Sequence, residues 1–220
     1  MSSHHIIRDN QEAALIIANG EPCSVALMEE LLEWSPFIVV LDGALRKVLE
    51  WGIKVDVWLG DFDSIESENI DFGGQDIEKI HAPDQNKTDL QKAFDYLVTK
   101  NFHSVHVLWG TGKRQDHHFN NIFTAAQWSE QMSISFIDDY SRAFICPKEF
   151  KKWYPKGTQL SLIPCGEARD VTTQNLVWNL ENDVLCLPHK TSSSNEVLMD
   201  GFVEISYETG YLILIEAYEK

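Results

Sequence analysis

Short apolar runs alternate with segments of helical periodicity through residues 14–138. The runs have the length of buried strands, and the clearest helical segment, residues 88–100, places its apolar residues three or four apart. This alternation predicts an α/β domain with a mostly parallel sheet and flanking helices. The predicted strands are residues 14–18, 37–41, 55–59, 77–81, 104–109 and 133–138, and the predicted helices are residues 24–34, 44–51, 88–100 and the segment through 119–126.

The pattern changes from about Arg142 onward. Helical periodicity disappears, and short apolar runs follow one another with Gly, Pro and Asn between them, as in an all-β module. We therefore predict a boundary near Ser141, with an α/β domain in residues 1–141 and an all-β sandwich in residues 142–220. The predicted strands of the second domain are residues 159–164, 176–180, 184–187, 201–207 and 211–217.

Charge and composition argue against several classes of function. A formal net charge of -16 would repel a phosphate backbone, so general nucleic-acid binding is not expected. The longest apolar runs are too short to cross a bilayer, and the first residues lack the features of a secretory signal. The four cysteines contain no Cys-x-x-Cys pair, which argues against a zinc site or a disulfide framework. These features predict a cytoplasmic protein with no membrane partner.

Polar residues gather where the predicted strands end. Ligands of open α/β sheets bind outside the carboxyl ends of the strands, so the chemistry of the protein is expected there. Four segments meet this description, namely residues 42–43, 60–64, 84–89 and 110–117.

Four aspartates in these segments are candidates for a metal site. Asp61 and Asp63 follow a strand as an Asp-x-Asp pair, which can direct two carboxylates at one hard cation such as Mg2+. Asp42 and Asp89 stand at other strand or helix ends that a doubly wound sheet would bring to the same edge. Each aspartate alone could equally serve a turn or a helix N-terminus, but together they favour a shared site. An acidic protein that binds a polyphosphate also needs a cation to hold it.

The segment 110–117 carries the opposite charge. Its glycines, Gly112 among them, leave backbone amides accessible, and the guanidinium of Arg114 suits phosphate oxygens. The segment matches neither a P-loop nor the dinucleotide fingerprint, and a turn with solvated charges is the alternative interpretation. On the next predicted helix, His117 and Asn120 are three residues apart and so share a face.

In this order the motifs resemble those of the thiamine pyrophosphokinase family. The resemblance extends over both predicted domains. One departure is the segment 54–58, which lacks a proline common in the family, and it touches no proposed ligand. The matching residues are 42–44, 60–64, 87–90 with Ala93, 110–117 with Asn120, 175–180 and 191–196.

The resemblance implies an N-terminal domain that binds ATP and Mg2+, a C-terminal sandwich that binds thiamine, and an active site completed across a homodimer. The implied metal ligands are Asp42, Asp61, Asp63 and Asp89. The implied catalytic residues are Asp61, Asp63, Asp89, Arg114 and Asp116. The implied contacts to ATP come from Asp42, Thr88, Gly112, Arg114, His117 and Asn120. The implied contacts to thiamine come from Trp178, Ser194 and Asn195.

The implied reaction moves the terminal pyrophosphate of ATP onto the hydroxyl of thiamine, with Asp116 or His117 orienting or deprotonating the alcohol. Two alternatives stay open at this point. A metal-dependent phosphohydrolase, or a pyrophosphokinase for another alcohol such as a pterin, could use the same acids. A non-catalytic sensor could bind nucleotide or thiamine without turnover. Trp178 could likewise be a core aromatic, and residues 192–194 could be ordinary loop residues.

Overall fold

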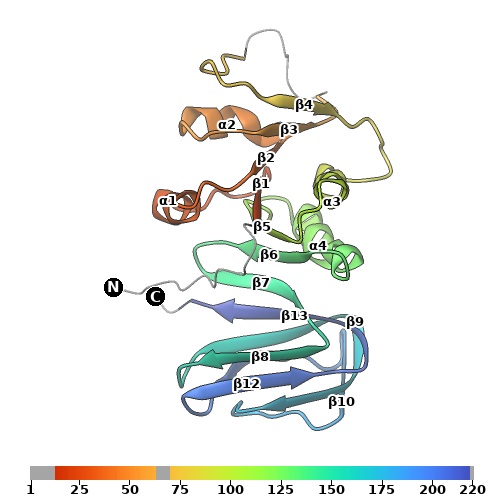
Figure 1. Ribbon diagram of the computed structural model, residues 1–220. Helices are drawn as coiled ribbons and strands as arrows, with labels where there is room; N and C mark the ends of the chain where they lie inside the picture. The colour runs from red at the N-terminus through yellow and green to blue at the C-terminus, as the bar shows by residue number, and fades with distance from the viewer. Residues whose placement is uncertain (1–12, 63–69, 219–220) are drawn as a thin grey trace. The chain divides into compact units, whose positions relative to one another are not determined.

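The computed structural model describes residues 13–62 and 70–218. The chain forms two compact units (Figure 1). The first comprises the described residues up to Asn121 together with Glu130–Ile134, and the second comprises Ile122–Ser129 and the described residues from Ser135 onward. An α/β unit followed by a β unit is the fold class predicted from the sequence, and the predicted boundary near Ser141 stays a prediction. Within the described residues, no helix is both long and apolar enough to span a bilayer.

A parallel sheet forms the centre of the first unit. Each of its pairings is parallel. The strands β1 (Ala14–Ile17), β2 (Ile38–Leu41) and β3 (Val57–Gly60) are buried along their whole length, which explains why their sequences are nearly continuous apolar runs. In spatial order the strands are β4 (Glu78–His81), β3 (Val57–Gly60), β2 (Ile38–Leu41), β1 (Ala14–Ile17) and β5 (Ser104–Leu108).

Helices cover both faces of this sheet, with α1 (Val25–Leu32) and α2 (Leu45–Glu50) on one side and α3 (Asp89–Thr99) on the other (Figure 1). The side chain of Ser24 caps α1 by accepting a hydrogen bond from Leu27 N at 3.3 Å. The predicted amphipathic helix is confirmed by α3, whose buried face includes Leu90, Ala93, Phe94 and Leu97. A short 3-10 turn (Asp42–Ala44) links β2 to α2.

The second unit is an antiparallel β structure. Its strands are β6 (Ser133–Ile137, of which the residues from Ser135 onward belong to this unit), β7 (Ser141–Cys146), β8 (Glu149–Tyr154), β9 (Gln159–Gln174), β10 (Asp183–Cys186), β11 (Ser192–Glu196), β12 (Gly201–Ser206) and β13 (Thr209–Ala217). They lie in the order β6-β7-β13-β9-β12-β8, and β10 and β11 also pair with β9. The long strand β9 therefore pairs with four other strands of the unit, β10, β11, β12 and β13.

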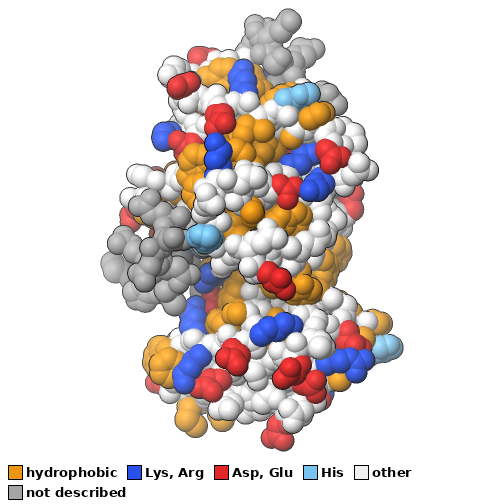
Figure 2. Space-filling model, turned by 45° about the vertical axis from the view of Figure 1, so that its right-hand side comes forward, with side chains coloured by type: hydrophobic (Ala, Val, Ile, Leu, Met, Phe, Trp, Pro, Cys, Tyr) orange, Lys and Arg blue, Asp and Glu red, His pale blue; other side chains and the backbone are white. Residues whose placement is uncertain are grey.

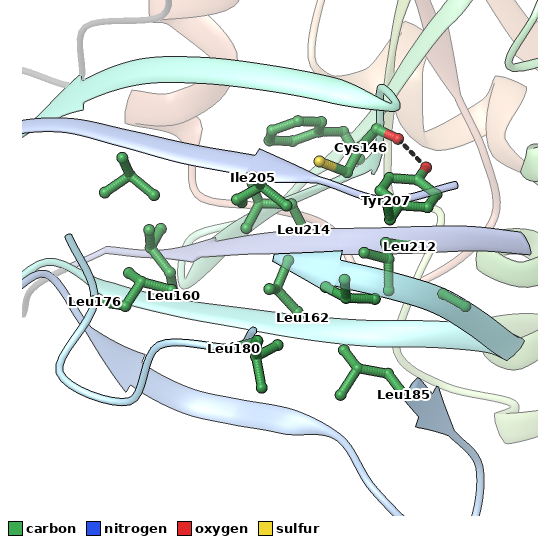
Figure 3. Close-up of a cluster of buried hydrophobic side chains, with 14 of the residues drawn as sticks. Cys146, Leu160, Leu162, Leu176, Leu180, Leu185, Ile205, Tyr207, Leu212 and Leu214 are labelled. Carbon is green, nitrogen blue, oxygen red and sulfur yellow. Dashed lines mark hydrogen bonds between the residues drawn. The ribbon is translucent and has the colours of Figure 1, made fainter. Parts of the chain in front are cut away.

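Leucine side chains from several strands of this unit form one apolar core (Figure 3). Leu160 and Leu162 come from β9, and Leu212 and Leu214 come from the neighbouring β13. The Tyr207 hydroxyl at the edge of the core donates to the carbonyl oxygen of Cys146 at 2.5 Å. This bond satisfies a phenol that would otherwise be costly to bury, and burial raises the pKa of Tyr207 well above its usual value.

One prediction about this unit was wrong, and two of its strands were not predicted. Residues 176–180 form turns and one isolated bridge rather than a strand, because Asn175 has a φ of +64° and Asn179 Oδ1 accepts a hydrogen bond from Leu176 N at 3.1 Å. Leu176 and Leu180 are buried and anchor this loop. Their apolar spacing, which is typical of a strand, is therefore explained by the burial of loop residues. The region before Gln159 contains the strands β7 and β8, which the sequence analysis did not predict.

Candidate active site

A cavity of about 680 Å³ opens at the carboxyl edge of the parallel sheet. The ends of β1, β2, β3 and β5 line it, together with the start of α3 and the first part of α4 (Gln115–Thr124). Acidic and basic side chains lie side by side on the face that Figure 2 shows. The predicted site residues that line the cavity are Asp42, Asp61, Thr88, Asp89, Gly112, Arg114 and His117.

Three carboxylates reach this cavity from three separate segments. Asp42 follows β2 and is only 3% exposed, whereas Asp61 and Asp89 are half-buried. Gly60 makes the approach of the first two segments feasible, because a Cβ atom there would lie 2.4 Å from the Cβ of Asp42. The predicted fourth member of the group, Asp63, lies outside the described residues.

A buried lysine accompanies these acids. Lys92 is 9% exposed, lines the cavity and donates from Nζ to Asp89 Oδ1 at 3.0 Å. Burial of an ammonium group is costly unless a charged partner accepts its hydrogen bonds, and Asp89 is that partner. The sequence analysis missed Lys92, although a lysine one turn after Asp89 and next to an apolar stripe was the available signal.

The N-terminus of α3 is closed by a capping box. Thr88 Oγ1 accepts from Gln91 N at 3.3 Å, and Gln91 Oε1 accepts from Thr88 N at 2.9 Å. The hydroxyl of Thr88 therefore serves the helix, and Thr88 also lines the cavity. The positive end of the helix dipole lies at this point, which suits an anion.

Hydrogen bonds from two directions hold the glycine loop after β5. Asn121 Nδ2 donates to the Gly110 carbonyl at 2.8 Å, and Lys113 Nζ donates to the Asn19 carbonyl at 3.2 Å. Gly112 has a φ of +76°, and a Cβ there would lie 2.6 Å from the Cβ of Glu21. The loop therefore needs glycine at this position for both conformation and space.

Arg114 and Asp116 form a solvent-exposed bidentate pair. Arg114 Nε donates to Asp116 Oδ1 at 3.1 Å, and a second bond joins the guanidinium to Oδ2. This hydrogen bonding lowers the pKa of Asp116 and raises the pKa of Arg114. Arg114 lines the cavity, but Asp116 and the predicted Asn120 are not among the lining residues, whereas Asn121 is.

The residues predicted to bind thiamine lie on one loop and one strand of the second unit. Trp178 is 63% exposed, so its indole face is open. Asn195 is buried, and its side chain pairs with the Trp178 backbone in both directions, Nδ2 donating to Trp178 O at 2.8 Å and Oδ1 accepting from Trp178 N at 3.2 Å. Ser194, at a φ of +52°, donates from its backbone to Ser161 Oγ at 2.9 Å. Asn195 thus holds the loop that presents Trp178.

Two family models match the chain, one to each part of the sequence. Residues 28–136 match the model described as "Thiamin pyrophosphokinase, catalytic domain", and residues 145–212 match "Thiamin pyrophosphokinase, vitamin B1 binding domain". The chain belongs to the thiamin pyrophosphokinase family. The resemblance found from the motifs is confirmed.

Sequence relatives carry the same family name. The chain is similar to Thiamin pyrophosphokinase 1 of Caenorhabditis elegans, with 24% identity over 208 residues that cover 87% of this chain and 84% of the relative. It is also similar to Thiamine pyrophosphokinase 1 of Oryza sativa subsp. japonica, with 31% identity over 160 residues that cover 66% of this chain and 60% of the relative.

Solved structures of thiamin pyrophosphokinases have the same fold as this chain. Thiamine pyrophosphokinase from Bacillus subtilis has a TM-score of 0.78 at 23% identity, covering 94% of this chain and all of that one. Yeast thiamin pyrophosphokinase has a TM-score of 0.81 at 15% identity, covering 96% of this chain and 88% of that one. The predicted fold class is therefore confirmed.

The donors that line the cavity suit the hard cation expected for this family. Asp42, Asp61 and Asp89 offer carboxylate oxygens at one edge of the sheet, and Mg2+ prefers one or two carboxylates together with phosphate oxygens and water. Among the described residues, no group of three or more His, Cys, Asp or Glu side chains is arranged to hold a metal by itself. The carboxylates of Asp42, Asp61 and Asp89 fit a hard cation whose other ligands are phosphate oxygens and water.

Proposed function

We propose that this chain transfers the terminal pyrophosphoryl group of ATP to the hydroxyl of thiamine, which yields thiamine diphosphate and AMP. The observation that carries this proposal is the cavity where Asp42, Asp61 and Asp89 meet Lys92 and Arg114, in a chain that matches both domains of the family. Phosphoryl transfer requires carboxylates that hold a cation and positively charged side chains that bind phosphate oxygens.

We assign Asp42, Asp61 and Asp89, with Asp63, to a Mg2+ site. When bound, the cation would neutralise charge on the triphosphate. Asp89 also holds Lys92 (3.0 Å), so this carboxylate organises an ammonium group beside the proposed metal site. The Lys92 ammonium lines the same cavity, which supports the binding of a triphosphate there.

The remaining proposed roles belong to the loop after β5 and the start of α4. Attack at the β-phosphorus requires the alcohol in line with the departing AMP, and the guanidinium of Arg114 would meet the charge that develops. Arg114 is engaged by Asp116 in the structure, and this exposed ion pair is weak enough for phosphate oxygens to replace it. Asp116 or His117 would orient or deprotonate the alcohol. Thr88, Gly112 and Asn120 are proposed to contact ATP.

For thiamine, we propose stacking on Trp178. The ligand has a permanent positive charge and flat rings, and an indole face attracts such a cation. The 63% exposure of Trp178 supports this role over that of a core aromatic. Ser194 and Asn195 are proposed to complete the thiamine contacts, Asn195 chiefly through its hold on the Trp178 backbone.

We further propose a homodimer and a cytoplasmic location. The homodimer rests on the family resemblance alone, and sedimentation equilibrium of the purified chain would test it. The location is supported by four free cysteines, as expected in a reducing compartment.

The deciding experiment incubates the protein with ATP, Mg2+ and thiamine and follows AMP and thiamine diphosphate by chromatography. Equal formation of both products, dependent on thiamine, is expected. Phosphate or AMP released without thiamine would replace the proposal by a hydrolase. Binding of nucleotide or thiamine without any product would replace it by a sensor. None of the relatives reported above is named as a hydrolase or as a sensor.

A further inference from the structure

Phe62, the residue between Asp61 and Asp63, has an unusual backbone conformation. Its φ is +62°, in the left-handed region that bulky L-residues avoid. Such a conformation persists only where the surroundings hold it, and it is concentrated at functional sites. The question is therefore what holds residue 62, and for what purpose.

The phenyl ring of Phe62 packs against two neighbouring strands. Its centroid lies 4.3 Å from that of Trp58, a buried residue of β3, with the planes tilted by 55°. It lies 5.8 Å from the His81 ring at the end of β4, with the planes only 23° apart. The Phe62 ring thus contacts side chains from two neighbouring strands, Trp58 of β3 and His81 of β4.

Strands β3 and β4, which carry Trp58 and His81, are hydrogen bonded to each other next to Asp61. Gly60 of β3 is the register partner of His81 in β4, and Ala82 N donates to Gly60 O at 2.9 Å. The backbones of the two strands are therefore fixed relative to each other next to residue 62. Ring contacts with side chains of both strands restrict the conformations open to residue 62.

The side chain of the adjacent residue, Asp61, lies in a different place from the Phe62 ring. Asp61 lines the cavity, and Phe62 is not among its lining residues. Because the two residues share a peptide group, the conformation held at residue 62 also restricts the backbone of Asp61 and with it the directions open to the carboxylate.

We propose that Phe62 is a positioning residue for the metal site: its ring, held between Trp58 and His81, keeps residue 62 left-handed and thereby directs the Asp61 carboxylate into the cavity. This inference rests on the proposed function, since it takes Asp61 as a metal ligand.

The proposal predicts an unusual order among variants at this position. Phe62→Tyr keeps the ring and should keep the site. Phe62→Gly removes the ring but tolerates a positive φ, whereas Phe62→Ala removes the ring and disfavours the conformation. Alanine should therefore harm metal binding more than glycine does. A purely structural packing role predicts the reverse order, because glycine leaves the larger void and the more flexible chain.

The test measures how much Mg2+ improves the affinity of the full chain for α,β-methylene-ATP, by calorimetry with Mg2+ and with EDTA. Phe62→Ala should reduce the Mg2+-dependent gain by about tenfold or more, as loss of a group that orients a metal ligand typically does. The affinity in EDTA should not change. Phe62→Gly should fall between Phe62→Ala and the unaltered protein.

Phe72→Ala is the matched control. Phe72 also contacts Trp58, with centroids 6.1 Å apart, so its loss removes an aromatic from the same cluster without touching residue 62. Its Mg2+-dependent gain should equal that of the unaltered protein. His81→Ala changes an exposed residue and removes one of the two ring contacts of Phe62. This variant should lower the Mg2+-dependent gain in affinity, which keeps the proposal testable if Phe62→Ala does not fold.

The outcomes separate the two proposals. A full Mg2+-dependent gain in both Phe62→Ala and His81→Ala, or a larger defect in Phe62→Gly than in Phe62→Ala, would overturn the role of Phe62 and leave the proposed function standing. If the unaltered chain neither binds the analogue nor forms thiamine diphosphate, the proposed function falls and this inference falls with it.

Discussion

Lys92 Nζ donates to Asp89 Oδ1 at 3.0 Å from a lysine that is almost fully buried. A buried ion pair of this kind costs desolvation and contributes little net stability. Its place on the wall of the cavity suggests a catalytic use instead. Asp89 holds the Lys92 ammonium beside the proposed metal site.

Lys92→Met keeps the length of the side chain but removes its charge. We expect kcat/KM to fall about ten- to a hundredfold, since a hydrogen bond to a charged group is worth roughly 1.5–3 kcal/mol. The melting temperature should change little, because methionine packs well in place of the buried alkyl chain. Lys100→Met, an exposed change at the end of the same helix, is the control. Unchanged kinetics in Lys92→Met would remove this lysine from the proposed site.

Asp61→Asn should abolish thiamine diphosphate formation while the chain stays folded. The amide keeps the shape of the side chain but loses the charge that a hard cation requires. Circular dichroism and the product assay together check this expectation. Asp76→Asn removes one charge from an exposed position of the same unit and should retain full activity. Residual turnover near the normal rate in Asp61→Asn would exclude Asp61 as a metal ligand.

Gly60→Ala should damage both the fold and the site. The added methyl group would meet the Cβ of Asp42 at 2.4 Å, and overpacking of this kind costs about 1–3 kcal/mol. Denaturant unfolding and turnover would both be measured. Gly73→Ala is the comparison, because residue 73 has a positive φ but open space around it. It should lower stability and keep turnover, so equal turnover in the two variants would contradict the packing argument.

Trp178→Ala should raise the KM for thiamine about tenfold, as expected for a cation over an indole face worth roughly 1–2 kcal/mol, and leave the KM for ATP unchanged. Asn195→Ala should give a similar rise in thiamine KM together with lower stability, because the Trp178 backbone loses its buried partner. In the double variant the thiamine effect should not increase further. Additive effects would show that Asn195 acts on thiamine independently of Trp178.

The pH dependence of the Arg114–Asp116 pair has a definite sign. The folded-state pKa of Asp116 lies below its ordinary value of 3.8 because Arg114 hydrogen bonds to the carboxylate. The pair is therefore intact at neutral pH, and its contribution is lost as the pH falls through that lowered pKa. An NMR titration of the Asp116 carboxyl carbon should give a midpoint below 3.8. Arg114→Gln should return the midpoint toward the ordinary value, and no change in Arg114→Gln would contradict the assignment.

Local pattern was sufficient for much of the fold. The parallel strands β1, β2, β3 and β5 and the helix α3 were predicted because a buried strand needs an apolar run and a half-buried helix needs a periodic stripe. The strands β7 and β8 were missed because residues 141–154 mix charged and aromatic side chains on a half-exposed surface. Residues 176–180 were mistaken for a strand because a buried loop residue and a buried strand residue are both apolar, and the sequence alone does not distinguish them.

The sequence by itself determined the family and the fold class, since short motifs in a fixed order carry that information, and it predicts a set of aspartates as metal ligands. Only the tertiary structure decided that Lys92 is buried against Asp89, that Asn195 hydrogen bonds to the backbone of Trp178, and that Phe62, at a positive φ, contacts Trp58 and His81. The contacts of Asn195 and His81 join residues distant in the chain, and their geometry depends on how strands and loops pack. No local pattern of residue types records such packing.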